Sequence, residues 1–215
     1  MIMGEILAER VSARFSDVMR ICPRLEQPPS RGYGPPMSDP STISDEYRQM
    51  QQSLHENPQY GSMGRHFAPL LKSYMERKKV PAISDYGAGK CSLRQGLIDE
   101  GLTDFEYYPY DPAFPEYGPP RPALLVACID VLEHIEEQYL DNVLRELASI
   151  TDGQGFFSIH EGPARKILPD GRNAHLIQKP TSWWLPRLCP YFEINQLQRA
   201  AGGFWVMTRR RKSAA

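Results

Sequence analysis

Residues 80–97, VPAISDYGAGKCSLRQGL, constrain the fold more than any other part of the chain, because their pattern predicts a buried strand, a glycine turn and a helix. The apolar run that leads to Asp85 is typical of a central parallel strand. Gly87 and Gly89 allow backbone angles, and a close approach of a ligand, that a side chain would prevent. The helix expected over residues 91–100 points its free N–H groups toward the same crevice, where open α/β sheets bind ligands. The stretch therefore predicts a nucleoside-binding turn.

Two types of nucleotide-binding turn compete for this arrangement of glycines. The fingerprint of nicotinamide-binding proteins requires a third glycine, three residues after the second, to seat a pyrophosphate on the end of the helix. Position 92 is Ser, which disfavours that alternative. The remaining pattern, Asp-Tyr-Gly-Ala-Gly, resembles the first motif of the class I S-adenosylmethionine-dependent methyltransferases. The resemblance implies that Asp85, Gly87 and Gly89 contact the methionine end of that cofactor.

A second acidic residue follows the next predicted strand. Residues 105–110, FEYYPY, form an aromatic, strand-prone run that ends at Asp111. Asp111 lies about 20 residues after the glycine turn, where folds of this kind place an acid on the ribose hydroxyls. Each charge-assisted hydrogen bond to such a carboxylate contributes roughly 1.5 to 3 kcal/mol. Asp111 is therefore predicted to bind the ribose; an Asp-Pro turn without a ligand is the alternative interpretation.

The third acidic residue, Asp130, ends the apolar strand predicted at the start of residues 123–150. The rest of this segment places apolar residues at helical spacing, so strand is expected to change to helix across residues 130–135. The string DVLEHI at this junction resembles the segment after the fourth strand in many small-molecule and RNA methyltransferases. Together with the two earlier motifs, it makes the chain similar to the class I methyltransferase family and implies that Asp130 also binds the cofactor.

The resemblance implies a Rossmann-like α/β fold with a seven-stranded, mostly parallel sheet, an antiparallel last strand and helices on both faces. Residues 155–160 are predicted to form the fifth strand, and residues 192–199 and 204–210 to form the closing hairpin. Before the glycine turn, helices are expected at residues 44–55, which begin with a good cap, and at residues 65–79.

Residues 1–43 are organised differently from the rest of the chain. Residues 6–19 are compatible with a short amphipathic helix. The proline-rich stretch after them cannot sustain a helix and is expected to form an extended linker or a covering arm. The sequence therefore predicts an N-terminal helix and proline-rich arm over residues 1–43, and a methyltransferase domain over residues 44–215.

A further resemblance concerns residues 172–184, RNAHLIQKPTSWW. They are similar to a His-containing loop and Trp-bearing helix of the small-RNA 3′-terminal 2′-O-methyltransferases. Carried over residue by residue, the resemblance implies a metal site made of Asp130, Glu133, His134 and His175. Oxygen and imidazole ligands suit Mg²⁺ or Mn²⁺. The Glu-His pair also occurs in methyltransferases without a metal, where the His faces the substrate.

These motifs leave the methyl acceptor open. The ubiquinone-pathway O-methyltransferases resemble the chain comparably well around DVLEHI, so the acceptor is either a small molecule or a nucleic acid. Trp183 and Trp184 either stack on such an acceptor or begin a helix buried against the sheet.

His134, His160 and His175 are candidate bases, because imidazole titrates near neutrality. An oxygen acceptor needs its proton removed by such a base, or its pKa lowered by an ion. We expect an O-methyltransferase; a catalytically inactive cofactor-binding or interaction protein is the alternative.

Composition adds few constraints on function. The formal net charge of −1 gives no general attraction for polyanions, so nucleic-acid binding would need a local basic patch. The four cysteines show no paired spacing and are expected to be reduced thiols.

No apolar stretch reaches the roughly 20 residues that span a membrane, and the N-terminus lacks a basic leader. We therefore expect a soluble cytoplasmic protein without a membrane partner; its oligomeric state does not follow from the sequence.

Overall fold

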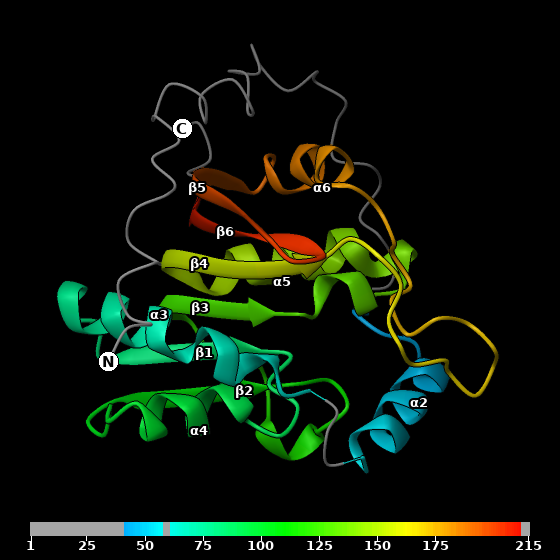
Figure 1. The fold of residues 1–215 in the computed structure, drawn as a ribbon, viewed down its shortest axis with the longest axis horizontal. Helices are drawn as coiled ribbons and strands as arrows, with labels where there is room; N and C mark the ends of the chain where they lie inside the picture. Colours follow the sequence, from blue (N-terminus) through cyan, green and yellow to red (C-terminus); the bar gives the residue numbers. More distant parts are fainter. Residues whose placement is uncertain (1–40, 58–60, 212–215) are drawn as a thin grey trace.

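The computed structural model describes residues 41–57 and 61–211. Its centre is a six-stranded sheet in the order β2-β1-β3-β4-β6-β5 (Figure 1). The strands are β1 (Ala82–Tyr86), β2 (Glu106–Tyr110), β3 (Ala123–Ile129), β4 (Thr151–His160), β5 (Phe192–Ala200) and β6 (Gly203–Arg210). The last strand, β6, runs antiparallel to both of its neighbours, and the other pairings are parallel. This confirms the predicted Rossmann-like, mostly parallel sheet with an antiparallel last strand.

The described residues form six strands instead of the predicted seven, and the strand that is lacking would lie beyond β2. In the described part of the chain β2 pairs with β1 alone and forms one edge of the sheet. Residues 111–122 separate β2 from β3 and contain one short 3-10 turn, η1 (Pro115–Tyr117). A crossover between parallel strands by itself takes a dozen or more residues, so this segment is too short to hold a crossover and a further strand. Pro109 within β2 fits an edge position, because proline has no N–H to donate to a second neighbour.

Helices cover both faces of the sheet, as predicted (Figure 1). Helices α3 (Met63–Lys78) and α4 (Ser92–Asp99) pack on one face, and α5 (Leu140–Ile150) and α6 (Thr181–Leu188) pack on the other. The buried side chains between the helices and the strands include Leu71, Leu97, Ile83, Leu125, Phe156, Val126, Phe157, Leu144, Leu147, Trp184 and Val206. Burial of this apolar surface on both faces explains why β3 is a continuous apolar run rather than an alternating one.

Helix α2 (Asp45–His55) lies beyond the carboxyl ends of the strands instead of on a face of the sheet (Figure 1). It begins where the sequence predicts, because the Ser44 side chain caps it by accepting the N–H of Tyr47 at 3.2 Å. Its apolar side packs against the long segment between β4 and α6 in a small separate cluster. That cluster is formed by Ile43, Tyr47, Leu168 and Ala174.

The junction after β3 differs from the predicted direct passage into a helix. Two short 3-10 turns, η2 (Leu132–His134) and η3 (Glu137–Tyr139), come first, and α5 begins only at Leu140. The apolar spacing after residue 135 predicts α5 correctly, but it carries no information on the tighter turns before it. These turns set the direction of the side chains that follow Asp130.

Two further expectations can be compared with the structure. Trp184 is fully buried in the core, which confirms the packing interpretation for that residue. Among the cysteines of the described residues, Cys91 and Cys128 are free thiols, whereas Cys189 is disulfide-bonded. The expectation of reduced thiols is therefore wrong for Cys189, because spacing along a chain does not reveal which residues the fold brings together.

The predicted N-terminal helix and proline-rich arm lie almost wholly outside the described residues. The division into residues 1–43 and 44–215 therefore stays a prediction. Within residues 41–57 and 61–211, none of the helices has the length and apolar character that a bilayer crossing requires.

Candidate functional site

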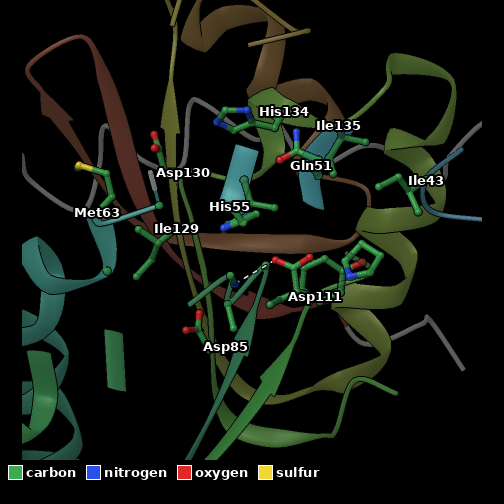
Figure 2. A pocket seen from close by; sticks show the side chains of 18 of the residues that line it. Ile43, Gln51, His55, Met63, Asp85, Asp111, Ile129, Asp130, His134 and Ile135 are labelled. Atoms are coloured by element: carbon green, nitrogen blue, oxygen red, sulfur yellow. Dashed lines mark hydrogen bonds between the residues drawn. The ribbon is translucent and has the colours of Figure 1, made fainter. Parts of the chain in front are cut away.

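The three predicted acidic residues meet in one pocket at the carboxyl ends of the parallel strands. Asp85 lies near the end of β1, Asp111 directly follows β2, and Asp130 directly follows β3. All three line the same pocket, together with Gly87 and Gly89 of the glycine turn (Figure 2). The parallel register of β2, β1 and β3 explains this convergence, because their carboxyl ends lie at one edge of the sheet.

The glycine turn has the backbone geometry that the sequence predicts. Gly87 and Gly89 have φ angles of 77° and 48°, a left-handed region that favours glycine. A Cβ atom at Gly87 would lie 2.4 Å from a methyl carbon of Val131, and one at Gly89 would lie 2.6 Å from Cε1 of His55. Both neighbours also line the pocket. The two glycines therefore make room for side chains from the β3–η2 junction and from α2.

Asp111 holds the glycine turn in place. Its two carboxylate oxygens accept the N–H groups of Gly89, at 3.0 Å, and of Ala113, at 2.8 Å. Burial raises the pKa of Asp111, and the two backbone hydrogen bonds oppose that shift. Each carboxylate oxygen has a second lone pair, so these bonds leave capacity for hydroxyl groups of a ligand.

Asp85 lines the pocket but is itself buried, with 4% of its surface exposed. The Tyr107 hydroxyl donates a hydrogen bond to its carboxylate. Burial raises the pKa of Asp85 to about 7, the bond from Tyr107 opposes the shift, and the nearby charge of Asp111 adds to it. A cationic group bound beside Asp85 would reverse the shift, so this carboxylate is suited to pair with an ammonium group.

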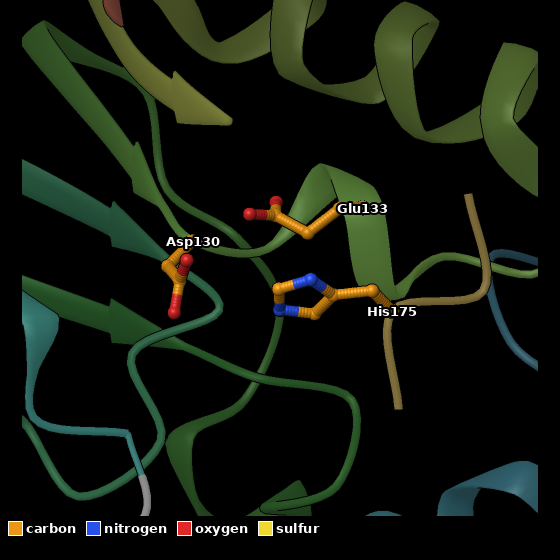
Figure 3. A group of neighbouring side chains, drawn as sticks. All are labelled: Asp130, Glu133 and His175. Carbon is orange, nitrogen blue, oxygen red and sulfur yellow. The ribbon is translucent and has the colours of Figure 1, made fainter. Parts of the chain in front are cut away.

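A second cluster adjoins the pocket through Asp130. One side-chain ligand atom each from Asp130, Glu133 and His175 lies within 4.8 Å of the other two (Figure 3). Asp130 has a φ angle of 58°, which is unusual for a residue other than glycine, and its N–H donates to the carbonyl and hydroxyl oxygens of Ser158. The fold thus holds Asp130 in a strained conformation between the pocket and the cluster.

Glu133 is fully buried within this cluster. Its Oε1 atom accepts the N–H of His160 at 2.6 Å, whereas Oε2 has no hydrogen-bond partner among the described residues. Burial, and then the charge of Asp130, raise the pKa of Glu133 well above its usual value. A buried carboxylate oxygen without a partner is costly, and a cation or a shared proton would compensate for it.

Hydrogen bonds fix the orientation of the imidazole rings near the cluster. Nδ1 of His134 lies 2.8 Å from the carbonyl oxygen of Ala174, and Nδ1 of His175 lies 2.7 Å from that of Gly162. A carbonyl oxygen only accepts, so in both rings Nδ1 carries the proton and Nε2 has the lone pair. His134 lines the pocket; its ring packs edge-on against His175, with 4.7 Å between ring centroids.

The predicted set of four metal ligands is therefore only partly brought together. Asp130, Glu133 and His175 converge, but His134 does not join that group. His160, the third candidate base, adjoins the cluster: its Nδ1 accepts the N–H of Gly162 at 3.1 Å, and its ring centroid lies 5.0 Å from that of His175. Of the three candidate bases, His134 is the one that lines the pocket.

No protein-family model matches the chain, and no curated protein sequence matches it significantly. Solved structures do resemble it. The mitomycin 7-O-methyltransferase MmcR matches with a TM-score of 0.53 and 16% sequence identity, over 75% of this chain and 60% of MmcR. The chain thus spans about 60% of the length of MmcR. It has the class I methyltransferase fold.

A second structure supports the same fold. The PH0226 protein from Pyrococcus horikoshii OT3 matches with a TM-score of 0.52 and 15% identity, over 78% of this chain and 100% of that protein. The match covers the whole length of PH0226. In our chain the glycine turn and the strand-end acids line one pocket at the carboxyl ends of the parallel strands, the edge at which open α/β sheets bind ligands.

Helix α2 supplies pocket residues that the sequence did not identify. Tyr47, Gln51 and His55 of α2 line the methyltransferase-fold pocket together with Ile43 just before the helix. Nothing in the pattern of α2 itself distinguishes a pocket wall from a surface helix, because Gln51 and His55 are ordinary residues on an amphipathic helix.

Proposed function

We propose that the protein is an S-adenosylmethionine-dependent methyltransferase that transfers the methyl group to an oxygen atom of a small molecule or a nucleic acid. The observation that carries this proposal is the convergence of Asp85, Asp111 and Asp130 on one pocket beside the glycine turn. The methyltransferase fold supports it, because ligands of such sheets bind at this edge. The compartment is proposed to be the cytoplasm.

The pocket residues fit this cofactor chemically. S-Adenosylmethionine supplies an electrophilic methyl group on a sulfonium. Asp85 is buried, and none of the groups that shift its pKa is a cation. Its carboxylate would therefore pair with the ammonium group at the methionine end of the cofactor. Asp111 would accept the ribose hydroxyls with the lone pairs that Gly89 and Ala113 leave. Asp130 borders the same pocket from the end of β3.

His134 is the base that the geometry favours for an oxygen acceptor. It lines the pocket, and its Nδ1–H is donated to Ala174, so Nε2 is the nitrogen that can take up a proton. Burial is the largest cause that lowers the pKa of His134, to about 4, so the ring is neutral at pH 7. Its role would be to accept the hydrogen bond of the acceptor hydroxyl and to take up the proton as the methyl group is transferred. The enzyme's main contribution would be alignment of the acceptor with the methyl group in a pocket shielded from water.

The two acceptor classes can be separated by salt. Binding of a nucleic acid would weaken steeply from low to moderate ionic strength, because phosphate contacts release counterions, whereas a neutral small molecule would hardly respond. A screen of extract fractions with radiolabelled cofactor would identify the acceptor, and the salt dependence of transfer would then assign its class.

Replacement of Asp111 by Asn tests the cofactor site. We expect the wild-type protein to bind S-adenosylhomocysteine and Asp111→Asn to bind it at least 10-fold more weakly, because a charge-assisted hydrogen bond contributes about 1.5 to 3 kcal/mol. Isothermal titration calorimetry measures both affinities. Asp104→Asn, at an exposed position before β2, is the matched control and should bind normally. A wild-type protein that does not bind the ligand would contradict the proposed function, and unchanged affinity in Asp111→Asn would contradict the ribose role.

We also propose that Asp130, Glu133 and His175 hold a divalent cation, Mg²⁺ or Mn²⁺, with His134 beside them. The unpartnered Oε2 of buried Glu133 and the Nε2 lone pair of His175 are donor atoms of the kind such an ion needs. A bound cation would lower the pKa of an acceptor hydroxyl next to it.

Glu133→Gln tests the cation site through stability. In the presence of EDTA we expect Glu133→Gln to be at least as stable as the wild type, because its amide can still accept from His160 and can donate to Asp130. Mn²⁺ should raise the melting temperature of the wild type but not that of Glu133→Gln, since binding to the native state alone stabilises it. The exposed Glu137→Gln is the control. Equal Mn²⁺ shifts in all three proteins, or transfer unaffected by EDTA, would reject the site.

A further inference from the structure

Helix α2 forms a wall of the pocket although it belongs to neither helical layer of the sheet. Three of its residues, Tyr47, Gln51 and His55, recur at one-turn spacing and face the pocket. Tyr47 and Gln51 are buried and hydrogen-bonded to each other at 2.5 Å. The helix therefore presents one continuous side to the space in which we place the cofactor.

Hydrogen bonds attach α2 to the loops that follow the strands. Ser44 donates from both its N–H and its hydroxyl to the carboxylate of Glu136, at 2.8 and 2.9 Å. Near the other end of the helix, the Gln52 amide donates to the carbonyl oxygen of Ala113 at 3.0 Å, two residues after Asp111. These bonds fix the helix relative to both the β3–α5 junction and the loop after β2.

His55, the last residue of α2, contacts the glycine turn directly. Its Cε1 atom occupies the space that a Cβ of Gly89 would need. Its ring also packs edge-on against Phe114 in the loop after Asp111, with 5.0 Å between ring centroids and a 76° interplanar angle. Since Gly89 donates its N–H to Asp111, His55 lies at the part of the pocket where the proposed ribose-binding carboxylate acts.

The environment of His55 keeps its ring uncharged. Burial, and then the positive charge of Lys90, lower its pKa to about 4. A neutral imidazole offers an apolar face and one hydrogen-bonding edge, which is the combination that a nucleoside, a flat ring on a hydroxylated sugar, can use.

We propose that His55 binds the nucleoside part of the cofactor, so that α2 forms a ligand-binding wall of this methyltransferase-fold pocket. The inference rests on the proposed function, because it assumes that the pocket takes S-adenosylmethionine. It assigns cofactor recognition to a residue outside the strand-end motifs. A purely structural His55 would instead fill the pocket, and its removal would leave cofactor binding unchanged or improve it.

The experiment compares His55→Ala with the wild type by calorimetry. S-Adenosylhomocysteine and 5′-deoxy-5′-methylthioadenosine are the probes, because the second has the nucleoside but lacks the amino acid. We expect His55→Ala to weaken both ligands at least 10-fold. His66→Ala, an exposed histidine on α3, is the matched control and should bind both normally. Equal or tighter binding by His55→Ala, or a loss confined to S-adenosylhomocysteine, would overturn the inference.

A second measurement avoids dependence on the alanine variant. In the wild-type protein with ¹⁵N-labelled histidine, the His55 ring signals should shift when S-adenosylhomocysteine is added, and His55→Gln assigns those signals. Unshifted His55 signals at saturation would also overturn the inference. Failure of the wild type to bind either ligand would reject this inference together with the proposed function, whereas normal binding by His55→Ala would reject the inference alone.

Discussion

Asp85→Asn is expected to abolish binding of S-adenosylhomocysteine, with a loss of at least about 100-fold, and at the same time to stabilise the ligand-free protein at pH 8. The loss follows from removal of the charge that pairs with the ligand's ammonium in a buried site. The gain follows from burial, which raises the pKa of Asp85 to about 7 and makes its ionised form costly in the folded state.

The pH dependence of this prediction has a definite sign. The folded-state pKa lies above the unfolded value of about 3.9, so the contribution of Asp85 to stability is complete below pH 4 and is lost as the pH rises through about 7. The loss reaches roughly 4 kcal/mol, at about 1.4 kcal/mol per pH unit. Urea unfolding of wild type and Asp85→Asn at pH 5 and pH 8 should capture roughly 3 kcal/mol of this loss, because pH 5 already lies about one unit above the unfolded pKa. Asp104→Asn is the control.

Cofactor binding should show the opposite trend with pH. Because the ammonium pairs with the ionised carboxylate, affinity of the wild type for S-adenosylhomocysteine should rise from pH 6 to pH 8 and then level off, above the pKa of Asp85 of about 7. The weak residual binding of Asp85→Asn should lack this dependence. An affinity of the wild type that stays constant over this range would contradict the assignment of Asp85 to the ammonium.

Trp184→Ala is expected to destabilise the protein by about 3 to 5 kcal/mol, the usual cost of removing a large buried aromatic side chain. Trp184 is fully buried between α6 and the sheet, and its indole N–H donates to the carbonyl oxygen of Lys179 at 3.1 Å. Urea unfolding measures the free energy. Trp183→Ala should cost much less, about 1 kcal/mol, because its ring is only partly buried at the edge of the core and has the Arg187 guanidinium 3.4 Å from its centre. Equal losses for the two variants would contradict the packing that we describe.

The sequence predicts the strand-end acids well because each is a local signal. An apolar or aromatic run that ends in Asp identifies the strand, its direction and the residue at its carboxyl end, as at Asp85, Asp111 and Asp130. Parallel pairing then brings the three residues together without further information. The helix at Asp45 is predicted for a similar reason, since its cap, Ser44, is adjacent in sequence.

The features that were not predicted depend on distant contacts or on tight turns. The position of α2 is set by Ser44 and Glu136, which are 92 residues apart and carry no mutual signal in one sequence. The separation of His134 from the Asp130 group follows from the 3-10 turn η2, whereas the four-ligand set was carried over from a resemblance that holds no information on this turn. The seventh strand came from the family resemblance, and the short segment at residues 111–122 leaves no room for it.

Within residues 41–57 and 61–211, β2 has no outer neighbour, and this has a consequence for how separate copies of the molecule avoid each other. An uncovered sheet edge offers unpaired backbone groups to any extended chain and is a common starting point for aggregation. Two residues of β2 oppose pairing with another chain. Pro109 has no backbone N–H to donate, and Glu106 places a charge on the exposed strand. The composition of this one short strand therefore helps to keep the sheet from continuing across neighbouring molecules.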